Sequence, residues 1–553
     1  MKNINKLIAS ALLGVAFVSC NDLDTEYVGY YVTSDQKDAV LEMNPEMAQA
    51  GVNTIASMFS RCGGILGEDN HSDFGYPGLM LGMDCMTADM NSRAVGYNHF
   101  QAWCAWSDIN PTGTINFLVW CNEYNQIYTA NSVLANITQE VAAGDDLLKV
   151  YRAQALGFRS FNYWVLAQMF QFNYQDNQQK PCVPIITEKN RDEVAEIGAA
   201  RASVEEVYSM IMSDLTEAIE LSEASKVSVL SLIASKPRRM LGLDALYGMR
   251  ARVNLTMGKY AEAAADAKKA IAVSSTSPLS IAECSKPGFN SLSAHNWMWG
   301  VAIAETDRVV TSGIINFPSQ ICSFAYGYVT VGVFRGIASD LWDAIPAGDV
   351  RRGWWLDDNY NSPIINDAQL EYLLSYGKGN VDDAGQSLIA HTNVKFDSYN
   401  SVLRQNVNAS DIPLMRIEEM YYIAAEGMAM SGQLAEATQF ISDFEKAYRN
   451  PSFVCLATTP ADFQEMIWNK RRVEFWGEGL AYFDLQRLKK NVNRLQAGCV
   501  PTWRYDITPN NPVRIMQIPE NEMQTNPMLN QNDSPDSPSG NNQQGVRPTP
   551  IRG

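Results

Sequence analysis

Two segments that lie 174 residues apart match each other when they are read in register. They are Leu243–Ala264 and Ile417–Thr438, and both contain the pattern Gly-x-apolar-Ala-Glu-Ala, at Gly258–Ala263 and Gly432–Ala437. In each segment, apolar residues at helical spacing run up to the glycine, and a second helical stretch with small residues follows it. Each segment is therefore expected to form a pair of helices with the glycine at the turn between them.

Paired helices that stack through Ala and Gly contacts bury a common core, which is the pattern of a tetratricopeptide repeat. Four further stretches have similar helical periodicity: Ile115–Ile137, Leu147–Phe172, Ser203–Ser222 and Thr459–Lys490. We therefore expect a mainly α protein with about eight long helices, arranged as four tetratricopeptide-like pairs.

Two long segments without helical periodicity interrupt these helices. The first insertion is Cys62–Pro111 and the second is Pro278–Asn406, and both are rich in Gly, Asn, Asp and aromatic residues. Insertions into a repeat scaffold are usually where binding takes place. We expect them to build an irregular lobe on the helices, with one insertion in each of two regions, residues 41–277 and 278–553, the second ending in a proline-rich irregular tail.

The start of the chain has the features of an export signal. Basic residues in Met1–Lys6 precede a short apolar run, Leu7–Val18, which is too short to cross a bilayer. Ser19-Cys20 then resembles the lipobox of bacterial lipoproteins, although Phe17 stands where leucine is usual. Residues 1–19 are thus expected to be a signal peptide, Cys20 a lipidated anchor and residues 20–40 a tether.

The charge and the cysteines narrow the classes of partner. The formal net charge is -18, which disfavours nucleic acid and anionic lipid as ligands. With Cys20 assigned to lipid, nine scattered cysteines remain and no C-x-x-C occurs. We expect mostly buried free thiols, with no structural zinc site and no redox dithiol.

Three motifs follow one another in the C-terminal half. They are Asp411–Arg416 (DIPLMR), then Arg471–Gly479 (RRVEFWGEG) with Phe483–Arg487 (FDLQR), and finally Ile518–Glu522 (IPENE) before Asn526–Pro527. In this order, in a chain of this length with helical repeats, they closely resemble the SusD/RagB family of Bacteroidetes. The resemblance covers nearly the whole mature chain.

The motif residues are expected to hold the fold. Their charges alternate in sign on consecutive turns, which suits burial with partners; the residues are Arg471, Arg472, Glu474, Glu478 and Asp484. The chain departs from the family at Lys470, where glutamate is usual, and at Ala481, where arginine is usual. We expect the ion pairs of this helix to be rearranged.

The resemblance also implies a function. It implies a lipid-anchored protein on the cell surface, in the outer membrane, that captures oligosaccharides for a SusC-like TonB-dependent transporter. At least one branch of the family handles peptides, which is the alternative ligand. The expectation is a binding protein, with no cofactor and no metal, and a surface glycoside hydrolase is the less favoured reading.

A sugar site needs aromatic faces and planar polar groups. Both insertions supply them, and the ligand-binding candidates are Asp73, Tyr76, Asp84, Asp89, Arg93, Trp103, Trp106, Phe317 and Tyr326. We expect at least one of Trp103 and Trp106 to present an exposed indole, because a polar insertion offers little regular structure to bury both. If both are buried, Phe317–Tyr328 becomes the better candidate. Trp297 and Trp299 are expected in the core.

Catalysis has little support in the sequence. Asp357-Asp358 and Asp382-Asp383 are adjacent acids that diverge in an extended chain, unlike the paired carboxylates of glycosidases. The chain has only four histidines and lacks both G-x-S-x-G and a Walker loop.

Overall fold

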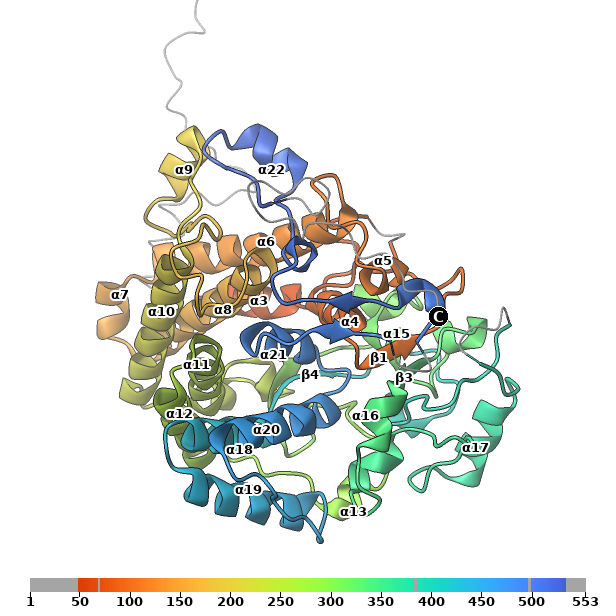
Figure 1. Cartoon of the computed structure of the whole chain (residues 1–553). Helices are drawn as coiled ribbons and strands as arrows, with labels where there is room; N and C mark the ends of the chain where they lie inside the picture. The colour runs from red at the N-terminus through yellow and green to blue at the C-terminus, as the bar shows by residue number, and fades with distance from the viewer. Residues whose placement is uncertain (1–47, 68–69, 381–384, 496–498, 534–553) are drawn as a thin grey trace, which may run out of the picture. The chain divides into compact units, whose positions relative to one another are not determined.

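The computed structural model describes residues 48–67, 70–380, 385–495 and 499–533. It is mainly helical, as expected (Figure 1). The principal helices are α3 (Ala48–Met58), α6 (Thr114–Asn136), α8 (Asp146–Phe170), α10 (Val204–Ala224), α11 (Leu243–Met257), α12 (Tyr260–Val273), α18 (Ile417–Met430), α19 (Leu434–Tyr448), α20 (Pro460–Glu474) and α21 (Ala481–Arg487).

These helices form a continuous stack. In the order α6, α8, α10, α11, α12, α18 and α19, each helix packs against the next, while α3 packs on α6 and α20 packs on α18 (Figure 1). The two matching segments form the pairs α11/α12 and α18/α19. Because α12 packs directly on α18, the stack crosses the proposed division between residues 277 and 278, and the described residues lie in one compact unit.

Glycines shape the turns and the contacts of the two pairs. Gly258 and Gly432 both have positive φ, 75° and 90°, and each lies at the turn inside its pair, as predicted. Gly427 allows the close contact of α18 with α12, because a methyl group there would lie 2.5 Å from the Tyr260 carbonyl oxygen and 2.9 Å from the Ala264 Cβ. The small residues therefore act as the sequence predicted.

Helix ends follow local signals in the sequence. Ser203 and Glu206 form a capping box at the start of α10, and Thr459 caps α20 ahead of Pro460. The expectation of one helix over Thr459–Lys490 is wrong. Gly477 and Gly479 have φ of 81° and 74°, so the chain breaks there into α20 and α21.

Short antiparallel strand pairs join distant parts of the chain. The pairs are β1 (Met90–Ser92) with β3 (Arg335–Ile337), β2 (Trp297–Val301) with β4 (Ile412–Arg416), and β5 (Val492–Asn493) with β6 (Asp506–Ile507). The first pair connects the two insertions. Trp297 and Trp299 on β2 are both 1% exposed, which confirms that they belong to the core.

The remaining elements are short. The first insertion holds α4 (Tyr76–Met86) and α5 (Gln101–Cys104). Between helices of the stack lie α7 (Gln139–Ala143), α9 (Arg191–Ile197) and the 3-10 turns η2 (Val229–Leu232) and η3 (Pro237–Arg239). The second insertion holds α13 (Ile281–Cys284), α14 (Arg308–Thr311), α15 (Phe317–Ile321), η4 (Tyr328–Val331), α16 (Ser339–Asp343), η5 (Val350–Trp354), α17 (Asp367–Leu374) and η6 (Tyr399–Ser401). The C-terminal part adds η7 (Pro501–Trp503), η8 (Pro512–Arg514) and α22 (Glu520–Thr525).

Two further sequence features can be compared with the structure, the cysteines and the hydropathy of the helices. The nine cysteines from Cys62 to Cys499 remain thiols in the described part of the chain, and all but Cys121 and Cys455 are buried, as expected. Cys20 lies outside the described residues. Across the part of the chain that the structure describes, every helix is too short or too polar to span a membrane.

Candidate functional site

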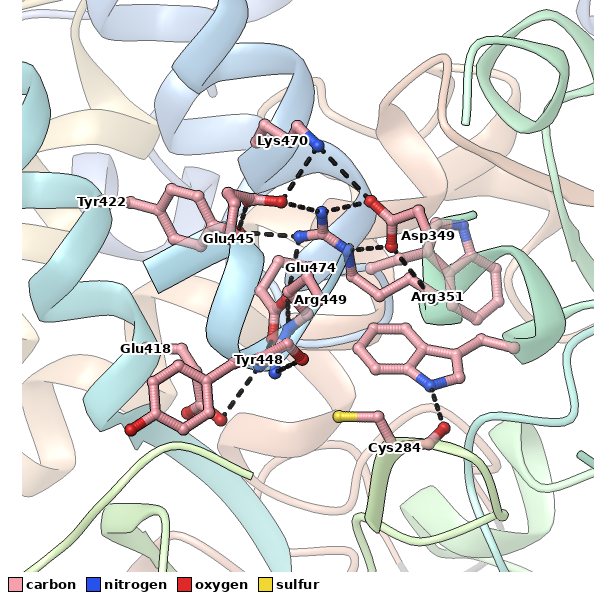
Figure 2. Close-up of polar contacts among 12 residues, drawn as sticks. Cys284, Asp349, Arg351, Glu418, Tyr422, Glu445, Tyr448, Arg449, Lys470 and Glu474 are labelled. Carbon is pink, nitrogen blue, oxygen red and sulfur yellow. Dashed lines mark hydrogen bonds and ion pairs between the residues drawn. The ribbon is translucent and has the colours of Figure 1, made fainter. Parts of the chain in front are cut away.

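Residues of the first two motifs meet in a buried cluster of charges, which we call the ionic core and part of which Figure 2 shows. Its members come from the second insertion, β4, α18, α19 and α20, and they are Asp349, Arg351, Lys395, Arg416, Glu418, Glu445, Arg449, Lys470, Glu474 and Glu478. Five are acidic and five are basic, so the cluster is balanced in formal charge. Apart from Lys470, at 14%, no member side chain is more than 5% exposed.

Arg351 lies at the centre of one half of the ionic core. Its guanidinium contacts Asp349 at 2.6 Å, Glu445 at 2.9 Å and Glu474 at 3.0 Å. Burial opposes the charge of Arg351, but the adjacent carboxylates outweigh it and raise the pKa of Arg351. Arg449 holds Glu474 from the other side, at 2.8 Å. All of these groups are satisfied by one another, which confirms a structural role.

Lys470 explains how the chain tolerates its departure from the family pattern. Its ammonium group contacts Glu445 at 3.0 Å and Asp349 at 3.4 Å (Figure 2). A glutamate at this position would face two carboxylates. The lysine at this position is therefore matched to the acids around it.

The other motif residues are paired as well. Arg471 contacts Asp484 at 2.7 Å, and Arg487 contacts both Asp484 and Glu426. Arg472 reaches back to Asp89 in the first insertion at 2.6 Å. The motifs thus fasten the first insertion to α20.

Five polar candidates of the first insertion lie in the interior. Tyr76 is 4% exposed in the core, and the others have protein partners. Asp73 accepts hydrogen bonds from two backbone amides, at 2.7 and 2.8 Å, and Asp84 accepts one from the Gly479 amide at 3.0 Å. Arg93 donates to the Ser387 carbonyl at 2.6 Å. Burial raises the pKa of Asp73 and of Asp84. In this structure Asp73, Asp84, Asp89 and Arg93 support the lobe.

The expectation of an exposed indole in the first insertion is wrong. Trp103 and Trp106 are each 2% exposed. Trp103 lies against α4 at Gly82, where a methyl group would be 2.5 Å from the ring, and Trp106 packs on Tyr482 of α21 with ring centroids 6.1 Å apart. Regular structure from α4 and α21 therefore covers both indoles, which the local sequence did not indicate.

The two candidates of the second insertion differ from each other. Phe317 is 3% exposed and packs edge-to-face on Phe396, at 6.0 Å between centroids. Tyr326 is 51% exposed. Tyr326 is the one residue among the nine ligand-binding candidates with a largely exposed side chain.

The insertions meet in an aromatic cluster that the sequence did not single out. His71 and His99 stack with ring centroids 4.3 Å apart, and Tyr328 meets both rings edge-on at 5.9 and 5.7 Å. A His71 ring nitrogen and the Tyr328 hydroxyl are hydrogen-bonded. Two exposed tyrosines lie next to these residues in the sequence. Tyr97, 59% exposed, precedes His99 by two positions, and Tyr326, 51% exposed, precedes Tyr328 by two positions. We call these five residues the His–Tyr face.

Buried amides hold the chain on either side of the His–Tyr face. The Asn98 side chain donates to Ser92 and to the Arg93 carbonyl and accepts from the Phe100 amide, at 2.9 to 3.1 Å. The Tyr326 carbonyl accepts a hydrogen bond from Asn408 at 3.1 Å. The exposed tyrosines thus project from fixed backbone. Less conformational entropy is therefore lost when they bind a ligand.

Protonation of the His–Tyr face is restricted. Burial and the neighbouring His71 lower the pKa of His99, so His99 favours the uncharged state near neutral pH. In the described ranges, moreover, His, Cys, Asp and Glu side chains do not gather in threes as a metal site would require. Stacking and hydrogen bonding to an uncharged ligand are the chemistry that this surface offers.

Comparisons with known proteins identify the family. Residues 79–255 match a SusD-like family described as "Starch-binding associating with outer membrane", and residues 361–535 match the SusD family. No curated protein matches the sequence.

Solved structures share the fold over nearly their whole length. A SusD-like carbohydrate binding protein from Bacteroides vulgatus has 22% identity and a TM-score of 0.70, with 90% of this chain and 98% of that one covered. A SusD superfamily protein from Bacteroides thetaiotaomicron has 20% identity and a TM-score of 0.67, covering 88% and 99%. Surface glycan-binding protein A from Bacteroides uniformis has 16% identity and a TM-score of 0.63, covering 88% and 99%.

From its two profile matches, its motifs and its fold, this chain belongs to the SusD/RagB family.

Proposed function

We propose that this protein is a surface glycan-binding lipoprotein that captures oligosaccharides and delivers them to a SusC-like TonB-dependent transporter of the outer membrane. The observation that supports it most directly is the His–Tyr face, where both insertions meet and present exposed tyrosines beside stacked imidazoles. Membership in a family whose description names starch binding and the outer membrane supports the ligand class.

The chemistry of the His–Tyr face suits a saccharide. Tyr97 and Tyr326 offer apolar ring faces for pyranose rings, and their hydroxyls and the exposed edge of His99 offer hydrogen bonds to sugar hydroxyls. Each of these groups stands on backbone fixed by buried amides. The protein would act by binding and release, without catalysis.

A binding panel tests the ligand. We expect the purified protein to bind at least one neutral oligosaccharide in isothermal titration calorimetry and to release no product over many hours. Binding of peptides in place of every oligosaccharide would assign the alternative, peptide-capturing branch of the family. Sustained product release, many turnovers per molecule, would contradict a binding function.

The partner and the anchor are tested in membranes. We expect a large β-barrel transporter to co-purify with the protein from native membranes in detergent. Cys20 lies outside the described residues, and its lipidation follows from the lipobox-like end of the signal. Replacing Cys20→Ala should move the protein into soluble fractions, and unchanged membrane association would remove the lipid anchor from the proposal.

A further inference from the structure

A second concave surface lies between the end of α3, the turn η3 and the segment that follows β2. It is a cavity of about 810 Å³, and we call it the basic cleft. Its charged lining residues are Arg61, Lys236, Arg239, Glu305, Asp307 and Arg308. This volume is in the range of pockets that hold small ligands.

The basic cleft has the opposite charge balance to the chain. Four of its six charged lining residues are basic, whereas the whole protein carries -18. A concave surface of one sign focuses its potential, because its low-dielectric walls screen it less than open water does. The cleft therefore attracts anions, although the protein as a whole repels them.

The acids of the cleft accept hydrogen bonds but keep their charge, so the six charged lining residues sum to a formal +2. Glu305 accepts a hydrogen bond from the Tyr399 hydroxyl at 2.8 Å, and Asp307 accepts one from the Ala304 amide at 2.8 Å. Lys236 is also occupied. Its ammonium group contacts Asp411 at 2.7 Å and donates to the Ile303 carbonyl, which fixes the wall of the cleft.

Arg239 is held in place but incompletely bonded. One terminal nitrogen donates to the Asn53 side chain on α3 at 3.2 Å. Its Nε–H is buried, and no acceptor for it exists among the described residues. A buried donor without a partner is unfavourable. A planar anion that reaches this edge of the guanidinium would supply the missing acceptor.

Arg61 faces the same cavity from the end of α3. It is exposed and forms no ion pair within the described ranges. Its aliphatic part packs against Gly64, where a methyl group would lie 2.8 Å from the Arg61 Cδ. The guanidinium is thus positioned at the cavity by its stem. Its charge also acts on the Asp73 carboxyl, where it partly offsets the burial that raises the pKa of Asp73.

We propose that the basic cleft binds the carboxylate or sulfate group of an acidic oligosaccharide, with Arg61 and Arg239 as the anion-binding residues. Tyr399, which also lines the cavity, supplies an aromatic wall for the sugar ring. The saccharide part of this inference rests on the proposed function. The anionic part rests on the cleft alone.

The test compares acidic sugars with their neutral counterparts on the full mature chain. Calorimetry would use trigalacturonate and its fully methyl-esterified form for the carboxylate, and a sulfated carrageenan tetrasaccharide, which carries no carboxylate, and its desulfated form for the sulfate ester. We expect one acidic probe to bind at least tenfold more tightly than its neutral counterpart, with affinity that falls as salt rises. Which acidic probe binds tells carboxylate from sulfate.

Variants locate the binding. Arg61→Gln with Arg239→Gln should lower the affinity for the acidic probe at least tenfold, while Arg191→Gln, an exposed arginine on α9, should leave it unchanged. Unchanged affinity in the double variant, equal affinity for acidic and neutral forms, or no binding of either acidic probe would overturn the inference. Melting curves of the variants establish that each is folded.

The same experiment separates this inference from the proposed function. Binding of a neutral oligosaccharide that is lost in Tyr97→Ala with Tyr326→Ala but kept in the double arginine variant would leave the proposed function intact. If the acidic probes then also fail to bind, only the anionic cleft is rejected.

Discussion

The ionic core and the His–Tyr face are both built from residues far apart in the chain, yet they differ in how they are bonded. In the ionic core every charge faces an opposite charge, and nearly all of it is sealed from water. In the His–Tyr face a buried tyrosine and two stacked histidines support exposed rings. The side chains of the ionic core bind one another, whereas the His–Tyr face keeps some side chains available to bind a ligand.

This difference separates residues that hold the fold from residues that can recognise a ligand. Removing a group from the ionic core leaves a buried partner uncompensated, which is expensive. Removing an exposed tyrosine leaves only water in its place. Stability and binding should therefore respond to different substitutions, and the following predictions test that separation from the largest effect to the smallest.

Arg351→Ala should cause the largest loss of stability. Three carboxylates lose their shared partner in a dry environment, so the free energy of unfolding should fall by about 3–5 kcal/mol. Urea denaturation measures it. Glu465→Ala is the control, because its pair with Lys490 is exposed and should be worth about 1 kcal/mol or less. Equal losses in both variants would contradict the ionic core's role.

Lys470→Glu should be nearly as damaging. It places a third carboxylate beside Asp349 and Glu445 and converts a balanced cluster into one with six acids and four bases. We expect a loss of roughly 3 kcal/mol, smaller than for Arg351 because Lys470 is partly open to water. Lys470→Met should cost less, since it removes the attraction without adding repulsion. A Lys470→Glu variant as stable as the wild type would show that the neighbouring acids do not depend on this charge.

The double variant Tyr97→Ala with Tyr326→Ala should lose ligand affinity and keep its stability, the opposite of the variants in the ionic core. Each ring contributes on the order of 1 kcal/mol to a stacked ligand, so affinity for an identified oligosaccharide should fall several-fold or more. The melting temperature should stay unchanged, because both side chains are largely exposed. Tyr128→Ala on α6, 65% exposed, is the matched control for losing a surface tyrosine. If the Tyr128→Ala control binds more weakly, or if the double variant binds as tightly as the wild type, the His–Tyr face is rejected as the site.

Acidification should give the smallest effect. The pKa of His99 is lowered in the folded protein, so its contribution to stability is present above the unfolded pKa, near 6.5, and is lost as pH falls below it. We expect binding to weaken modestly between pH 7.5 and pH 5.5 as His99 becomes protonated in the stack. His99→Gln should flatten this pH dependence. A pH profile identical in the wild type and His99→Gln would exclude the histidine pair as its origin.

Most of the fold could be predicted because its signals are local. Helical spacing, the Ser203 capping box and the Thr459-Pro460 start all lie within a few residues of the helices that they define. The break between α20 and α21 was missed, although Gly477-Glu478-Gly479 carries it in the sequence, because the apolar spacing continues past it. Alternating charges in one motif indicated that Glu474 and Glu478 would be buried with partners, but they did not indicate the partners Arg351 and Arg449.

The site was harder to predict because exposure in an irregular segment depends on distant residues. Trp103 is buried by Gly82 and Trp106 by Tyr482, and neither contact leaves a periodic pattern near the tryptophans. The contact of His71 with Tyr328 joins residues that are 257 positions apart in the sequence. A list of aromatic residues in the two insertions contained the right kind of chemistry, but only the tertiary structure selects which rings reach the surface.

The direct packing of α12 on α18 also makes the closure of the stack a long-range event in folding. The chain between them, residues 274–416, includes the whole second insertion. Until α18 docks, the face of α12 that receives Gly427 has no partner. Closing this long loop should slow folding relative to a repeat array without insertions.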